Sequence, residues 1–349
     1  MFTRRGIAAL VLGLPLASAS GWAQLAPSPD APPVSTAPAA PENDQSVATF
    51  KIQVNLVDLF FTVKDKSGNL VPHLNRDDCT VQEDKQPQKW KSFVAENNLP
   101  LTLGILLDTS GSQQYVLPLE QQAGSQFLDR VLKPKDEAFL LSFDVNVDLL
   151  QDFTNSPRLL ARAMSKAEIN TAGGNGAAGI PGAGGGTVPT IGDPKGTLLY
   201  DAVFLTAKEK LNQESGRKAM IILTDGEDQG SKTRINEAVA AAQRSNAMIY
   251  VILIADTGFY GGFGYSGYSA ARKLAEETGG RVINVGNNGK KLEAAFQQIE
   301  AELRTEYVGT YTPTNTKLDG TFRHVAVECR GDGMKVQVRK GYFSPGAQQ

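Results

Sequence analysis

The chain has 349 residues, with 35 Lys and Arg against 37 Asp and Glu, a net charge of −2 and an apolar content of 41%. This length allows roughly two domains, and the composition is ordinary for a globular protein. The charge balance excludes a polybasic nucleic-acid binder and a polyacidic disordered chain. Two cysteines and two histidines are too few for a structural zinc site or a disulfide-dense scaffold.

Residues 1–23 have the layout of a cleaved secretory signal: an arginine pair, a short apolar run, and small residues that suit cleavage before Gln24. The alternative is an uncleaved membrane anchor, for which the apolar run is short. Residues 24–48, rich in Pro, Ala and Ser, are predicted to form a disordered linker. We therefore expect an extracytoplasmic protein, periplasmic or secreted, with no membrane span after signal cleavage.

Two segments, 50–98 and 306–345, alternate apolar and polar residues with the period of β-strands. In the second, strands are predicted at 307–311, 325–327 and 336–338, with a hairpin turn at 330–333. Neither segment has enough strands for a core of its own, and the ends of a domain tend to lie close together. The two segments are therefore predicted to form one β-sandwich-like domain.

The part between them, 99–305, alternates buried strands with amphipathic helices. Continuous apolar runs at 101–107, 138–143, 219–223 and 248–255 are typical of strands covered on both faces of a parallel sheet. Helical patterns occupy 112–132, 157–168, 197–212, 233–245, 268–278 and 289–304. This alternation predicts a doubly wound, Rossmann-like α/β domain. Two glycine-rich segments interrupt it, at 171–196 and 257–268.

Carboxylates and hydroxyls gather where the predicted strands end. Asp108, Ser110 and Ser112 follow the first strand as D-x-S-x-S, Asp225 follows the third, and Thr197 opens the helix before that strand. Loops beyond the carboxyl ends of strands form the ligand crevice of an open α/β sheet. Such oxygen ligands suit Mg²⁺, Mn²⁺ or Ca²⁺ rather than zinc. The alternative is that the Asp and Ser residues only cap helices.

These residues resemble the metal-ion-dependent adhesion site of von Willebrand factor type A domains, in which D-x-S-x-S is combined with a distant Thr and a distant Asp. All five positions match, and the resemblance covers 99–305. The flanks are similar to those of a bacterial subgroup of exported proteins of this family. In that subgroup the sequence at the end of the last strand is much like that of residues 339–343. The glycine-rich insertion before Thr197 departs from the family pattern without changing a ligand.

The resemblance implies a role for each of the five residues. Ser110, Ser112 and Thr197 would bind the ion directly or through water. One of Asp108 and Asp225 would bind directly and the other through water. One position then remains open for an Asp or Glu of a protein partner.

Three functions remain open at this point. The first is a non-enzymatic, metal-dependent binding or adhesion module. The second is a structural subunit whose metal only holds loops together. The third is a metal-assisted hydrolase with Glu227 or Asp228 as general base. We expect the first, with no enzymatic activity and no nucleic acid partner; the sequence leaves the oligomeric state open.

A disulfide and an aromatic docking surface complete the predictions. Cys79 and Cys329 each lie in phase with inward residues of their strands, and an exported protein favours pairing, although two separate buried thiols are the alternative. Aromatic residues in the second glycine-rich segment would stand beside the metal and contact a partner, unless the segment is only a flexible loop. They are Phe259, Tyr260, Phe263, Tyr265 and Tyr268.

Overall fold

The computed structural model describes residues 56–96, 99–170, 196–254 and 267–346. All of them belong to one of the two units into which the chain divides, and the other unit, Met1–Ile52, lies outside them. The predicted signal sequence and linker therefore lie outside the described residues, as does most of each glycine-rich segment. Across the described ranges, no helix combines the length and the apolar character needed to cross a bilayer.

A six-stranded sheet, ordered β10-β9-β8-β5-β6-β7, forms the centre of the α/β domain. Its strands are β5 (Leu101–Asp108), β6 (Glu137–Phe143), β7 (Val147–Thr154), β8 (Arg217–Thr224), β9 (Ala247–Leu253) and β10 (Val282–Asn284). Neighbouring strands are parallel except β6 and β7. Every residue of β5, β8 and β9 is buried. Their sequences are almost continuously apolar because neither face of these strands meets solvent.

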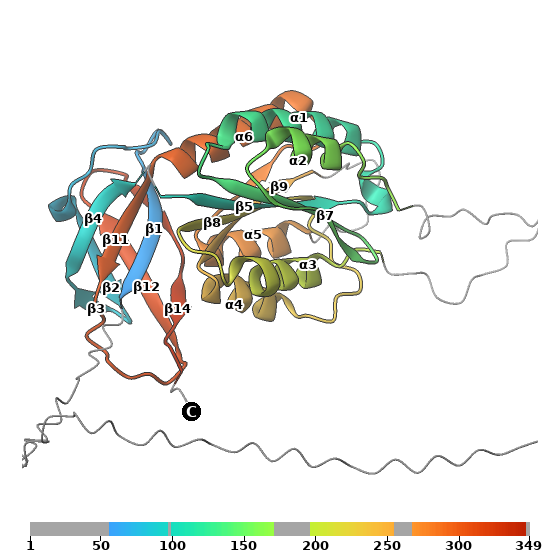
Figure 1. Cartoon of the computed structure of the whole chain (residues 1–349). Helices are drawn as coiled ribbons and strands as arrows, with labels where there is room; N and C mark the ends of the chain where they lie inside the picture. Colours follow the sequence, from blue (N-terminus) through green and yellow to red (C-terminus); the bar gives the residue numbers. More distant parts are fainter. Residues whose placement is uncertain (1–55, 97–98, 171–195, 255–266, 347–349) are drawn as a thin grey trace, which may run out of the picture. The chain divides into compact units, whose positions relative to one another are not determined.

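Helices cover both faces of this sheet (Figure 1). They are α1 (Leu117–Val131), α2 (Pro157–Met164), α3 (Leu199–Leu205), α4 (Ile235–Arg244), α5 (Gly267–Thr278) and α6 (Gly289–Arg304). Ile105 and Leu107 pack on the side of α1, α2 and α6, whereas Leu106 packs on the side of α3, α4 and α5. The chain therefore has the doubly wound α/β fold that the sequence predicts.

The carboxyl ends of β5 and β8 meet at the point where the strand order reverses. The chain leaves β5 for β6 on one side and later returns to β8 on the other side of β5. Leu107 of β5 lies opposite Leu223 of β8, so both strands end at the same edge. In open α/β sheets this reversal opens the crevice in which ligands bind.

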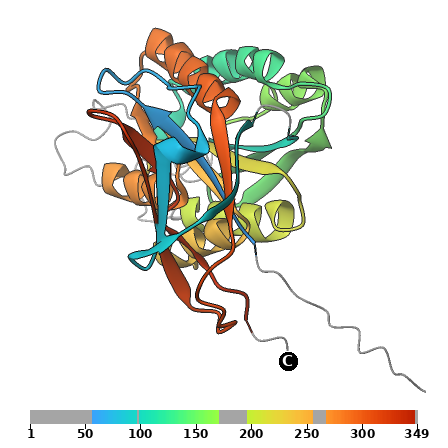
Figure 2. The ribbon, with the colours of Figure 1, turned by 90° about the vertical axis from the view of Figure 1, so that its left-hand side faces the viewer.

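The flanking segments form two antiparallel four-stranded sheets, ordered β13-β1-β11-β4 and β14-β12-β2-β3. The strands are β1 (Val57–Lys64), β2 (Cys79–Glu83), β3 (Gln86–Gln88), β4 (Trp90–Glu96), β11 (Glu306–Tyr311), β12 (Phe322–Cys329), β13 (Lys335–Val338) and β14 (Gly341–Phe343). The short helix η1 (Arg76–Asp78) precedes β2. Each sheet combines strands of both segments, which lie beside one another in Figure 2. The β-sandwich thus depends on both flanks of the α/β domain.

Aromatic rings and one disulfide fill the sandwich. Phe61 stacks on Tyr307 with ring centroids 5.5 Å apart, and Phe93 lies 5.4 Å from the same ring. Cys79 of β2 lies opposite Cys329 of β12, and the two sulfur atoms are bonded. The disulfide therefore joins one strand from each flank.

The predicted hairpin at 330–333 is wrong. The chain does reverse there, because Gly331 and Gly333 adopt φ of 133° and 72°. However, β12 pairs with β2 and β14, whereas β13 pairs with β1 in the other sheet. Turn residues indicate a reversal of the chain, but strand pairing depends on which partners bury the apolar faces.

Two predicted helices are divided in the structure. The pattern at 112–132 begins with the short helix η2 (Gly111–Gln113) and continues, after a break, as α1. The pattern at 197–212 comprises α3 and a π-helical stretch, η4 (Thr206–Leu211).

Ion pairs connect the sandwich to the α/β domain. Lys64 Nζ of β1 lies 2.8 Å from Glu302 Oε1 of α6. Arg217 of β8 lies 3.6 Å from Glu306, the first residue of β11, and both side chains are buried.

Candidate metal centre

Two carboxylates meet at the carboxyl edge of the central sheet. Asp108 ends β5 and Asp225 follows β8, and their exposed fractions are 0% and 2%. Burial, followed by the negative charge of Asp225, raises the pKa of Asp108 to about 7. The fold thus places two acidic groups where neither is well solvated, an arrangement that a cation would stabilise.

Hydrogen bonds fix the orientation of the Asp108 carboxylate. The Thr224 hydroxyl donates to Oδ2 at 2.6 Å, and the backbone N–H of Ser110 donates to Oδ1 at 3.0 Å. The second bond turns the chain back on itself directly after β5. This turn brings the hydroxyls of Ser110 and Ser112 to 3.0 Å from each other.

Thr197 reaches the same edge through backbone contacts with the loop that follows β8. Its carbonyl accepts from Gln229 N at 2.8 Å, and its N–H donates to Gln229 O at 3.4 Å. The side chain of Thr197 is 6% exposed. The structure therefore places Asp108, Ser110, Ser112 and Asp225 on two adjacent loops and holds Thr197 against the second loop.

Asp144 is a positioning residue that the sequence analysis missed. It directly follows β6, and its Oδ2 accepts from the Thr109 hydroxyl at 2.8 Å. Its Oδ1 accepts from Asn170 Nδ2 at 3.1 Å, and its carbonyl accepts from Leu198 N at 2.8 Å. One residue thus connects the D-x-S-x-S loop to the segment that carries Thr197. The sequence could have indicated this role, because Asp144 is a polar residue directly after a buried strand.

The two carboxylates considered as general bases, Glu227 and Asp228, accept hydrogen bonds from groups around the loop after β8. Glu227 Oε1 accepts from Gly267 N at 2.8 Å, which ties the start of α5 to the loop after β8. Asp228 Oδ1 accepts from the Ser231 hydroxyl at 2.6 Å and from Tyr200 N at 3.1 Å. Both residues therefore shape the loop that carries Asp225.

The donor set fits a hard divalent cation. Among the described residues, Asp108 forms no ion pair with Lys or Arg, so no basic side chain there takes the place of an ion. Within the same ranges, no three His, Cys, Asp or Glu side chains form a metal-binding group. Any site at this edge thus depends on hydroxyl as well as carboxylate oxygens, which are ligands of divalent cations.

Neither family models nor curated proteins give a match to the sequence. Solved structures do. BatB from Bacteroides thetaiotaomicron is 18% identical with a TM-score of 0.42, over 58% of this chain and 98% of that one. A von Willebrand factor type A protein from Catenulispora acidiphila is 12% identical with a TM-score of 0.43, over 86% of this chain and 76% of that one.

A third solved structure is proximal thread matrix protein 1 from the mussel byssus, described with a zinc-occupied MIDAS motif. It is 16% identical with a TM-score of 0.45, over 64% of this chain and 50% of that one. The chain resembles von Willebrand factor type A domains. Its sheet order, its helices on both faces and the two loops with Asp108 and Asp225 are the features of this chain that carry the resemblance.

Most of the predicted aromatic surface lies outside the described residues, namely Phe259, Tyr260, Phe263 and Tyr265. Tyr268 is described, near the start of α5, and is 48% exposed. The sequence analysis missed Tyr115, which lies three residues after Ser112 and is 73% exposed. The D-x-S-x-S loop therefore carries an exposed aromatic ring of its own.

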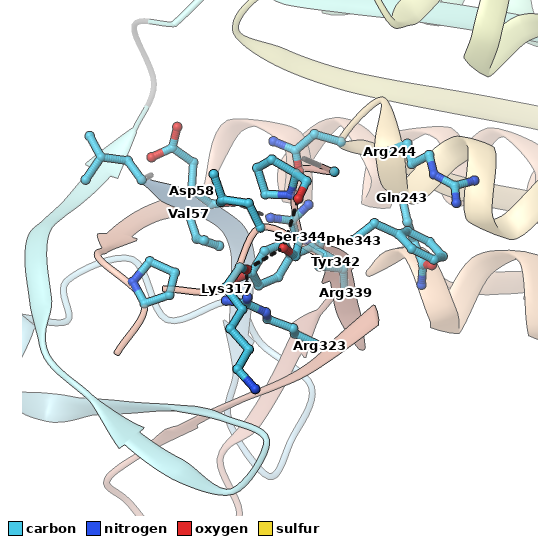
Figure 3. A pocket seen from close by; sticks show the side chains of 16 residues that line it. Val57, Asp58, Gln243, Arg244, Lys317, Arg323, Arg339, Tyr342, Phe343 and Ser344 are labelled. Atoms are coloured by element: carbon cyan, nitrogen blue, oxygen red, sulfur yellow. Dashed lines mark hydrogen bonds between the residues drawn. The ribbon is translucent and has the colours of Figure 1, made fainter. Parts of the chain in front are cut away.

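A separate hollow of about 710 Å³ lies between the sandwich and the carboxyl end of α4 (Figure 3). This is the opposite edge of the central sheet, because α4 leads into the start of β9. Arg244 stacks 4.0 Å above the ring of Phe343, and Arg339 Nη2 donates to Asp58 O at 2.9 Å. The first contact joins α4 of the α/β domain to β14 of the sandwich, and the second lies within the sandwich, so both arginines along the hollow have structural partners.

Proposed function

We propose that this protein is a metal-dependent binding module whose type A domain captures an acidic residue of a protein partner. The observation that carries the proposal is the meeting of buried Asp108 and Asp225 with the hydroxyl loop of Ser110 and Ser112 at the strand reversal. The bound cation would supply a positive charge that attracts a carboxylate oxygen of the partner.

The residues of the site would have two different roles. Asp108 and Asp225 provide the negative charge that retains the ion, while Ser110, Ser112 and Thr197 provide neutral oxygens. Neutral ligands leave more of the ion's charge available to a partner than further carboxylates would. Mg²⁺ is the proposed ion, with Mn²⁺ and Ca²⁺ as the other hard-ion candidates.

Aromatic side chains beside the centre would select the partner. Tyr115 and Tyr268 are exposed, and tyrosine is enriched at protein interfaces. Phe259, Tyr260, Phe263 and Tyr265 belong to the same proposed surface by their position in the sequence. The proposed setting is extracytoplasmic, and the proposed activity is binding without catalysis.

Titration calorimetry with Mg²⁺, followed by a carboxylate-capture assay, tests this function. Wild type should bind Mg²⁺ and should adhere to immobilised poly-glutamate, but not to poly-glutamine, in Mg²⁺ and not in EDTA. Asp108→Asn should lose both properties. Asp148→Asn, on an exposed position of β7, is the matched control and should keep both.

Two results would contradict the proposal in different ways. Equal Mg²⁺ affinity of wild type and Asp108→Asn would place the ion elsewhere. Normal Mg²⁺ binding without poly-glutamate capture would favour the structural alternative, in which the ion only holds loops together.

A further inference from the structure

Glu120 is a buried acid with no hydrogen-bond partner. It lies near the start of α1, the helix that follows the D-x-S-x-S loop, and its exposed fraction is 0%. Neither Oε1 nor Oε2 accepts a hydrogen bond from any described residue. Buried carboxylates are ordinarily paired or hydrogen-bonded, so this position requires an explanation.

Packing does not explain the residue. The other buried side chains of α1 include Phe127, Leu128 and Val131, which fill the core beside the sheet. An apolar side chain at position 120 would fill the same space without the desolvation of a carboxyl group. Helix capping does not explain it either, because Glu120 accepts no backbone N–H.

The acidic groups whose charges act on Glu120 are two of the proposed metal ligands. After burial itself, the negative charges of Asp108 and Asp225 are what raise the pKa of Glu120. Three carboxyl groups from β5, α1 and the loop after β8 therefore interact in one dry region. In the described residues, no Lys or Arg forms an ion pair with Glu120 or Asp108.

A second buried acceptor lies in the same region. Gln113 is 1% exposed, and its Nε2 donates to Ser112 Oγ at 3.4 Å and to Ile254 O at 3.5 Å. Its Oε1 accepts no hydrogen bond from the part of the chain that the structure describes. The unpartnered groups on this side of the site, Gln113 Oε1 and both oxygens of Glu120, are all acceptors. Water molecules in the shell of a bound cation are strong donors and would satisfy them.

We propose that Glu120 is a third carboxylate of the metal centre, acting from its outer shell as an acceptor for ion-bound water. The inference rests on the proposed function, because it assumes a cation at Asp108 and Asp225. Glu120 would leave the neutral inner ligands unchanged while adding negative charge behind them. That charge favours a divalent over a monovalent ion and makes the ion-free protein less stable than its packing alone would allow.

The charge-removing variant Glu120→Gln tests the role. It should weaken Mg²⁺ binding by roughly 10- to 100-fold in calorimetry, as loss of an outer-shell partner does. In EDTA it should melt at a higher temperature than wild type, because the substitution removes the cost of burying an acidic group in the field of two other acids. Asp129→Asn removes one charge from an exposed position of α1 and should change neither quantity.

The failure of this inference is distinguishable from failure of the proposed function. If wild type and Asp108→Asn bind Mg²⁺ equally, the proposed metal centre itself is wrong. If Asp108→Asn loses Mg²⁺ while Glu120→Gln binds as wild type does, Glu120 is only a neutral acid of the core. Glu120→Met, of similar length, replaces Glu120→Gln if that variant does not fold, and unchanged Mg²⁺ affinity in it would overturn the inference equally.

Discussion

Thr224 shows how a single hydroxyl can hold a metal ligand in place. It donates to Asp108 Oδ2 at 2.6 Å and accepts from Gly226 N at 2.9 Å. It is fully buried at the end of β8. It therefore orients the carboxylate of one loop while shaping the loop that carries Asp225.

We expect Thr224→Val to weaken Mg²⁺ binding by roughly 10-fold, because Asp108 loses the donor that orients it. The variant should also lose about 1–3 kcal/mol of unfolding free energy, since the Gly226 N–H is left without its acceptor. Calorimetry and urea denaturation measure the two effects. Thr62→Val is the control, because the buried Thr62 hydroxyl has no hydrogen-bond partner among the described residues and its removal should not destabilise. Equal Mg²⁺ affinity and equal free energy of unfolding in the two variants would contradict the role assigned to Thr224.

The sequence could indicate the five candidate ligands, because their residue types and positions after strands form a pattern along the chain. It could not indicate Thr224, Asp144 or Glu120 in the same way. Their roles arise from contacts between β5, β6, α1 and β8 that only the fold creates. Glu120 in particular lies in a sequence that is otherwise typical of an ordinary amphipathic helix.

At the scale of elements, the β2–β12 pair is reinforced covalently. The disulfide joins residues 250 positions apart, so it encloses the whole α/β domain in one loop. Closing a long loop removes conformational freedom from the unfolded chain.

Replacing both cysteines with alanine should therefore lower the free energy of unfolding by about 2–5 kcal/mol. Reductant should impose a similar loss on the wild type and none on the double variant, which serves as the control. Denaturation curves with and without dithiothreitol measure both. Identical curves for oxidised and reduced wild type would show that the bond contributes little to stability.

Burial explains which elements the sequence could predict. β5, β8 and β9 are covered on both faces, and each appears in the sequence as an apolar run. β7 was missed because it lies at the edge of the sheet, and its eight residues are half-buried or exposed without regular alternation. Sheet membership of β12 and β13 depends on pairing with residues more than 200 positions earlier, which local turn residues do not specify.

At the scale of the whole molecule, Glu306 lies where the α/β domain joins the sandwich. It is 1% exposed and faces Arg217, and the charges of Glu302 and Arg304 also act on its pKa. Burial raises its pKa from 4.5 to about 8, and this outweighs the opposing effect of Arg217. Between these two values the folded protein holds a proton that the unfolded chain releases. The contribution of Glu306 to the free energy of unfolding is therefore full below about pH 4.5 and falls as the pH rises towards 8.

Glu306→Gln mimics the protonated side chain and should remove this part of the pH dependence. Relative to wild type, the variant should gain stability as the pH rises from 5.5 to 8.5, measured by urea denaturation at both values. Glu328→Gln, at an exposed position of β12, should keep the wild-type pH dependence. If the free energies of unfolding of Glu306→Gln and wild type differ by the same amount at both pH values, Glu306 is not the source of this pH dependence.

The bond between Cys79 and Cys329 also determines how the molecule would carry a mechanical load. Tension applied between residues 56 and 346 passes along the backbone to Cys79, crosses the sulfur atoms and continues from Cys329. The 249 positions between the two cysteines are bypassed, and they contain the entire α/β domain with its candidate metal ligands. A pull on the two ends would thus leave the binding edge undistorted, whereas a pull by a captured partner would load the α/β domain directly.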